Sequence, residues 1–79
     1  MDDLNLKTEN AEFGQYLRSV RQAKKISIRQ LAKAVSKTPT YISDIEKGNN
    51  KPPERELLDR IIAELHLEEF PDIRNKLYD

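Results

Sequence analysis

Apolar residues recur along this chain at intervals of three and four positions, the spacing that brings side chains onto one face of a helix. The first series is Phe13, Leu17 and Val20, which predicts a helix over residues 9–24 that starts at Thr8. Two shorter series predict helices over 28–35 and 39–47. A fourth helix, beginning at Pro53 and Glu54, carries a wide apolar stripe formed by Leu57, Leu58, Ile61, Ile62 and Leu65. No segment shows the apolar and polar alternation of a strand, so the fold class is all-α.

The ends of the two short helices carry their own signals. Ser27, followed three residues later by Gln30, forms the capping box that starts the helix at residue 28. Thr38 caps the next helix, and Pro39 occupies its first position, where a missing N–H costs nothing. Gly48 ends that helix, because glycine readily adopts the left-handed conformation.

A glycine interrupts the first predicted helix. Gly14 weakens that helix by about 1 kcal/mol relative to alanine. We therefore expect it to permit a close packing contact.

Seventy-nine residues leave room for one domain. We divide the chain into a flexible N-terminal segment (1–8), a domain (9–66) and a C-terminal tail (67–79) with a fifth short helix starting at Pro71. The tail contains Phe70, Leu77 and Tyr78, which are more apolar side chains than so small a domain needs. They either form an interface between two copies of the chain or pack on the first and fourth helices.

Charge is unevenly distributed although the formal net charge is zero. Residues 18–51 hold nine basic and two acidic residues and so carry +7, whereas residues 1–17 carry −3 and residues 52–79 carry −4. A basic central block with acidic ends is typical of a domain with one face toward a polyanion. The alternative is an uneven scatter of charges on a small solvated domain.

The composition excludes several kinds of site. The chain has no cysteine and a single histidine, His66, so disulfides, thiolate nucleophiles and cysteine zinc sites are excluded, and we expect no metal and no cofactor. The adjacent Glu68 and Glu69 point in different directions on a helix, with no nucleophile nearby, so we do not expect an enzyme. No stretch is long and apolar enough for a membrane span or a signal peptide, and we expect a cytoplasmic protein.

Residues 28–48 are the most informative segment, because two short helices joined by a tight turn form a helix-turn-helix. Leu31, Ala32 and Val35 are placed to meet Ile42 and Ile45, and Ala32 is small enough to let the helices approach closely. Over residues 12–66 the order and spacing of several short motifs resemble those of the lambda-repressor-like, XRE-type regulators. Besides Leu31-Ala32, the motifs are Phe13-Gly14, Leu17, Val20-Arg21, Tyr41-Ile42-Ser43, Ile45-Glu46, Gly48 and Pro53.

The chain departs from that family at the turn. Ser36 stands where the family usually has glycine, and serine does not take positive φ freely. Lys37 stands where valine is common, which gives up a core contact and adds a charge that can reach phosphate.

The resemblance implies that helix 39–47 enters the major groove of DNA, with base contacts from Thr38, Pro39, Thr40 and Asp44. Thr40 can hydrogen-bond a base or pack on a thymine methyl group, and Asp44 can accept from cytosine N4. Asp44 is alternatively a solvated charge or an intrahelical partner of Lys47.

Phosphate contacts are expected from side chains around this helix, and they position the domain without reading sequence. They are Ser27, Arg29, Lys37, Tyr41, Ser43, Asn49, Asn50 and Lys51.

The resemblance also implies a structural ion pair between Arg21 and Glu46. We therefore expect a transcriptional regulator, a repressor, that binds double-stranded operator DNA as a homodimer reading two half-sites about 34 Å apart. The alternative is an interaction module, such as an antitoxin, that holds a partner protein. The neutral net charge and the acidic, apolar C-terminal segment favour this alternative.

Overall fold

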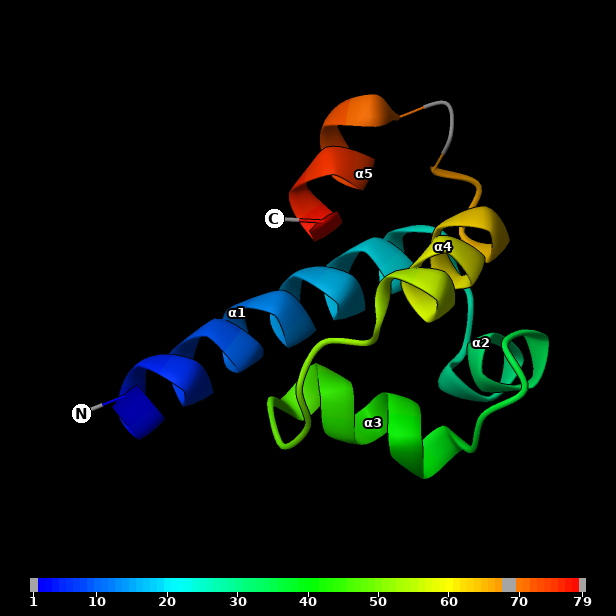
Figure 1. The fold of residues 1–79 in the computed structure, drawn as a ribbon. Helices are drawn as coiled ribbons and strands as arrows, with labels where there is room; N and C mark the ends of the chain where they lie inside the picture. The colour runs from blue at the N-terminus through cyan, green and yellow to red at the C-terminus, as the bar shows by residue number, and fades with distance from the viewer. Residues whose placement is uncertain (1, 68–69, 79) are drawn as a thin grey trace.

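A computed structural model describes the backbone of residues 2–67 and 70–78 and the side chains from Asn10 onward. Within it the chain forms five helices and no strand: α1 (Asp2–Ala23), α2 (Ile28–Ala34), α3 (Pro39–Lys47), α4 (Arg55–Glu64) and α5 (Pro71–Tyr78). The predicted all-α, five-helix fold is confirmed. α1 crosses the middle of the molecule, with α2 and α3 on one side of it and α5 on the other (Figure 1).

The start of α1 was predicted wrongly. It begins at Asp2 rather than near residue 9, so residues 2–8, predicted as a flexible segment, are helical, and Thr8 lies inside the helix. The physical reason is that residues 2–13 contain neither proline nor glycine, so nothing interrupts the helix between Asp2 and the apolar series that begins at Phe13. Met1 of that predicted segment, and Glu68, Glu69 and Asp79 of the predicted tail, lie outside the described residues.

The core lies where α1, α2, α3 and α4 meet, and two leucines of the tail complete it. Phe13 and Tyr16 pack against its edge and are half-buried. The buried apolar residues are Leu17, Val20, Leu31, Ala32, Val35, Ile42, Ile45, Leu58, Ile61, Ile62, Leu65, Leu67 and Leu77. None of the helices in residues 2–67 and 70–78 combines the length and apolar character that spanning a bilayer requires.

Side chains close the first turns of α2 and α3 as predicted. The Ser27 hydroxyl accepts from the Gln30 N–H at 3.0 Å, and the Ser27 N–H donates to Gln30 Oε1 at 2.8 Å, which completes the capping box. The Thr38 hydroxyl accepts from the Tyr41 N–H at 3.1 Å, with Pro39 in the first turn. These short helices therefore begin at defined residues, since their free N–H groups are satisfied locally.

Four helices are followed by a residue with positive φ, and three of these residues are not glycine. They are Lys25 (58°), Ser36 (60°), Gly48 (81°) and His66 (55°). After α2 the Lys37 N–H donates to the Ala32 carbonyl at 2.8 Å and the Ser36 N–H donates to the Lys33 carbonyl at 3.2 Å. This is the Schellman arrangement, and it requires the left-handed conformation at Ser36.

Two glycines let α1 approach α3 backbone to backbone. A Cβ atom at Gly14 would overlap the Ile45 carbonyl oxygen and would lie 2.5 Å from that of Glu46. At Gly48 a Cβ atom would lie 2.9 Å from the Ala11 Cα atom. The close contact expected at Gly14 is confirmed, and it fixes the separation of the two helices.

α5 is fastened to the body of the domain. Leu77 is buried in the chain's own core, which for this residue favours packing of the tail over an interface between copies. Lys24 Nζ lies 4.3 Å from the centre of the Phe70 ring, and the Arg55 guanidinium lies 4.9 Å from the centre of the Tyr78 ring. The Tyr78 hydroxyl donates to Asp59 Oδ1, and this hydrogen bond raises the pKa of Tyr78, because a phenolate would face the carboxylate.

We predict that Ser36→Gly stabilises the domain by about 0.5–1 kcal/mol. Glycine removes the strain of the left-handed conformation at this exposed residue, and this gain exceeds the opposing effect of a higher conformational entropy in the unfolded chain. The measurement is the free energy of unfolding from urea titration. Ala34→Gly, at the exposed last residue of α2, is the control and should cost up to about 1 kcal/mol. Equal losses in both variants would contradict the left-handed turn.

We predict that Gly14→Ala destabilises the domain by about 1–3 kcal/mol, although alanine is the better helix former, because the added methyl group meets main-chain carbonyls that cannot rotate away. The measurement is the urea concentration at the midpoint of unfolding, compared at an unchanged slope of free energy against urea concentration. Gln15→Ala, at the exposed neighbouring position, should change stability by less than about 0.5 kcal/mol. A Gly14→Ala protein as stable as the parent would refute the contact.

Candidate nucleic-acid interface

α2 and α3 form the helix-turn-helix unit predicted from residues 28–48. Leu31, Ala32 and Val35 are buried on α2, and Ile42 and Ile45 are fully buried on α3. The two helices pack against each other through these residues. The polar residues of α3 are thereby left on its outer side.

The residues predicted to contact bases lie at the amino-terminal half and outer side of α3. Thr38, Pro39 and Thr40 are exposed, and Asp44 is half-buried. The Thr38 hydroxyl accepts the hydrogen bond of the helix cap, and its O–H remains free to donate. The Asp44 carboxylate makes no ion pair with Lys47 or with any other side chain that the structure describes.

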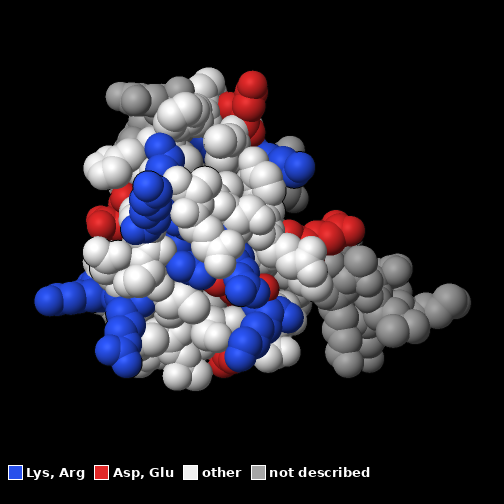
Figure 2. All heavy atoms as spheres, turned by 180° about the vertical axis from the view of Figure 1, so that it is seen from behind, with Lys and Arg blue, Asp and Glu red and all other residues white. Residues whose placement is uncertain are grey.

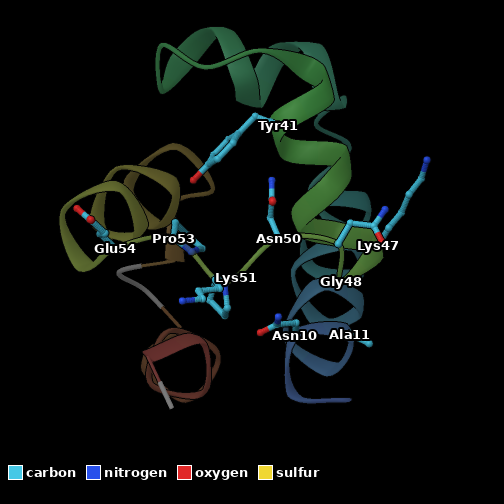
Figure 3. Close-up of a pocket in the computed structure, with 11 residues that line it drawn as sticks. Asn10, Ala11, Tyr41, Lys47, Gly48, Asn50, Lys51, Pro53 and Glu54 are labelled. Atoms are coloured by element: carbon cyan, nitrogen blue, oxygen red, sulfur yellow. The ribbon is translucent and has the colours of Figure 1, made fainter. Parts of the chain in front are cut away.

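Tyr41 and Ser43 lie on opposite flanks of α3. Successive helical residues are rotated by about 100°, and Ile42 between them points into the core. Tyr41 is half-buried and faces the start of α4 (Figure 3), and Lys37 Nζ lies 5.4 Å from the centre of its ring. Ser43 is half-buried on the flank that carries Glu46 and faces α1.

An open hollow lies on the Tyr41 flank, between α3, the loop that follows it and α1 (Figure 3). The predicted phosphate contacts Tyr41, Asn49, Asn50 and Lys51 all line it. Asn10 and Ala11 of α1 also line it, and neither was identified from the sequence. No local pattern signals them, because they meet the loop only through the packing of α1 against α3.

The other predicted phosphate contacts lie at the start of α2. Ser27 is exposed, and its hydroxyl and its N–H are both engaged in the capping box with Gln30. Arg29 is exposed one turn away from Lys33, so both cations project from the outer side of α2. Lys37, in the turn, is exposed as well.

Arg21 and Glu46 join α1 to α3 through a buried bidentate ion pair. Arg21 Nε donates to Glu46 Oε2 at 2.6 Å, and Arg21 Nη2 donates to Glu46 Oε1 at 3.0 Å. The third nitrogen, Nη1, donates to the Ile26 carbonyl at 2.8 Å. The two residues are only 7% and 6% exposed, so this pair holds α3 in place and is not a surface charge.

Basic side chains dominate one side of the molecule. Seen from behind, most Lys and Arg atoms lie over the lower part, at the height of α2 and α3, and others lie higher; Asp and Glu atoms lie mainly at the upper edge and the sides, with smaller areas low on this face (Figure 2). The basic block predicted from residues 18–51 therefore becomes a surface in space. Such a surface attracts a polyanion even though the whole chain carries no net charge.

This arrangement of helices agrees with comparison to known proteins. A family model described as a helix-turn-helix domain matches residues 12–68. The chain belongs to the helix-turn-helix domain family. The resemblance predicted from the sequence is confirmed at this level, and the five-helix fold agrees with a solved relative.

This helix-turn-helix chain is similar to the clp gene regulator ClgR from C. glutamicum, whose crystal structure matches it with a TM-score of 0.72. The sequence identity is 29%, and the match covers 87% of this chain and 86% of that chain. A comparison with curated proteins gave no match.

We predict a strong coupling between Arg21 and Glu46 in a double-mutant cycle. Arg21→Ala and Glu46→Ala should each cost about 3–5 kcal/mol, because each leaves a buried charge without its partner. The double variant should cost clearly less than the sum of the two, with a coupling energy of up to about 3 kcal/mol. The free energies of unfolding come from urea titration of the four proteins.

The exposed pair Glu56 and Arg60 provides the matched control. These residues lie one turn apart on α4 with 3.9 Å between Oε1 and Nη2, and both side chains are largely exposed. Their cycle should show a coupling of about 0.5 kcal/mol or less. Equal couplings in the two cycles would mean that burial does not strengthen the Arg21–Glu46 pair.

Proposed function

We propose that this chain is a transcriptional regulator that binds double-stranded DNA by sequence and inserts α3 into the major groove. The observation that carries the proposal is the division of α3 into two faces. Ile42, Ile45 and Glu46 anchor one face to the domain, whereas Thr38, Pro39 and Thr40 are exposed at its capped end. An anchored helix with a free polar end suits a groove about 12 Å wide.

Base recognition is proposed for Thr38, Pro39, Thr40 and Asp44. Thr40 donates to a base acceptor or packs its methyl group on thymine, and Pro39 offers only an apolar contact. The unpaired Asp44 carboxylate favours acceptance from cytosine N4, since a charge near phosphates is otherwise repelled.

The DNA backbone is proposed to run along the Tyr41 flank of α3. The hollow on that flank is lined by Tyr41, by Lys47 and Lys51 and by three asparagines, Asn10, Asn49 and Asn50, with Glu54 as the one acidic residue among the described residues that line it. Ser27 and Arg29 at the start of α2 and Lys37 in the turn supply further contacts, and Ser43, on the opposite flank of α3, is proposed to contact the other backbone. Such contacts fix the register of the domain on DNA and carry no sequence information themselves.

The regulatory part of the proposal is supported by the similarity to ClgR, which is described as a regulator of clp genes. We infer a repressor, because occupying an operator blocks other proteins from that DNA. Binding as a homodimer would place two α3 helices in successive turns of the major groove.

The location of a dimer contact is constrained by the fold. α5 and α3 lie on opposite sides of α1 (Figure 1), so a contact through the outer side of α5 would turn the two α3 helices away from one duplex. We therefore propose that the two copies meet beside the DNA and that the tail serves mainly to complete the core.

A partner protein is the second candidate ligand. Phe70 and Tyr78 are 42% and 37% exposed, at the two ends of α5, which lies on the other side of α1 from α3 (Figure 1). A protein held there would leave α3 free for DNA, and a pull-down that survives nuclease treatment would detect it.

The decisive experiment is selection of bound sequences from a random duplex pool, which should return a dyad-symmetric motif. On that motif, Thr40→Ala should relax preference at one base position by about 1–3 kcal/mol. Lys51→Ala should weaken all duplexes alike and lower the slope of log affinity against log salt by about 0.9. Titrations at several salt concentrations measure both effects.

Lys76→Ala is the control, because Lys76 is exposed on α5, away from α3. It should change neither the preference nor the slope. If selected and scrambled duplexes bind alike at every salt concentration, or if Thr40→Ala weakens all sequences equally, groove recognition by α3 is wrong.

A further inference from the structure

The two flanks of α3 differ in what they offer to DNA. The Tyr41 flank has a hollow lined by the side chains that we propose to bind phosphate. On the opposite flank Ser43 is half-buried and Glu46 is engaged with Arg21. A helix in the major groove lies between two phosphate backbones, so a cation beside the second flank would strengthen binding there.

The position of Arg18 on α1 follows from its neighbours. Leu17 is fully buried, so Tyr16 and Arg18 lie on opposite flanks of α1. Lys76 of α5 lies 4.7 Å from the centre of the Tyr16 ring, which identifies the Tyr16 flank as the one that faces α5. Since α5 and α3 lie on opposite sides of α1 (Figure 1), Arg18 is on the flank that faces α3.

The packing of α1 brings this flank next to α3. Gly14, one turn before Arg18, contacts the carbonyls of Ile45 and Glu46, and Arg21, one turn after it, binds Glu46. Arg18 thus lies between two residues that touch α3, yet it is exposed. Its guanidinium makes no ion pair with any side chain that the structure describes.

The exposed neighbours of Arg18 on this edge are uncharged. Gln15 lies one turn before it and Gln22 one turn after it, and both are exposed. An arginine between two amides presents hydrogen-bond donors and no carboxylate, which suits a phosphodiester group. We call Gln15, Arg18 and Gln22 the α1 edge.

We propose that the α1 edge is a second phosphate-binding surface, in which Arg18 binds the DNA strand opposite to the one bound by Lys51. The proposal rests on the proposed function, because it requires α3 to lie in the major groove. α3 is then held between the two strands by cations from different parts of the chain. The close approach of α1 to α3 at Gly14 sets the distance between the two groups of cations.

The test compares Arg18→Gln with Arg74→Gln, a matched loss of one charge on α5, and with Arg18→Lys, which keeps the charge. Binding to the selected operator is measured against salt. Arg18→Gln should lower the slope by about 0.9, whereas Arg74→Gln and Arg18→Lys should keep the parent slope. Thermal unfolding of each Arg18 variant checks the fold. The unfolding temperature should equal that of the parent, because Arg18 is exposed.

Duplexes with a single neutral methylphosphonate then identify the phosphate. Replacing the phosphate that Arg18 binds should weaken the parent protein but leave Arg18→Gln unaffected. Lys51→Gln should show the same insensitivity at a phosphate of the other strand.

The outcomes separate this proposal from the function on which it rests. If Arg18→Gln keeps the parent slope and all phosphate sensitivities while Lys51→Gln loses one, the α1 edge is not a contact but binding by α3 stands. If Arg18→Gln and Lys51→Gln both lose sensitivity to methylphosphonates on the same strand, the proposal that they bind opposite strands is wrong. If no duplex is selected and no variant changes the slope, the proposed function itself fails.

Discussion

The contact between α1 and α3 is the constraint on which the rest of this structure depends. Arg21 uses three nitrogens to join α1 to Glu46 on α3 and to the Ile26 carbonyl before α2. Gly14 supplies the second part of the contact, since its missing side chain lets the α3 backbone approach. Removing two charges from water costs several kcal/mol, so this pair contributes more to the orientation of α3 than to net stability.

Short helices depend on such external support. α2 has seven residues and α3 has nine, lengths at which an isolated helix is marginal in water. Side-chain caps at Ser27 and Thr38 and left-handed residues at Ser36 and Gly48 satisfy the free groups at their ends. Burial of Leu31, Ile42 and Ile45 then provides the stabilisation that helices this short lack by themselves.

Charge and shape act together on the α3 side of the domain. A net charge of zero hides a basic side at the height of α2 and α3, because the acidic residues lie mainly in the end segments of the chain (Figure 2). α5 completes the core with Leu77 on the side away from α3. No other helix among the described residues covers the outer side of α3, and Lys37, Lys47 and Lys51, before, at the end of and after the helix, are exposed.

The sequence by itself determined the features that depend on neighbours within a few residues. The bounds of α3, the capping box at Ser27, the glycine at the end of α3 and the buried face made of Ile42 and Ile45 follow from spacing and capping chemistry. The early start of α1 was not predicted, because Thr8 has the chemistry of a helix cap and only the absence of proline and glycine favours a helix before it. The Arg21–Glu46 pair was expected from family resemblance, since no spacing rule joins residues 25 positions apart.

Only the tertiary structure decided which side chains share a surface. Asn10 and Ala11 border the same hollow as Asn50 and Lys51, and Arg18 lies beside α3, because α1 packs against α3 with one backbone close to the other. That approach depends on the angle and distance between two helices. Both quantities are set by the whole core at once, so no segment of the sequence contains them.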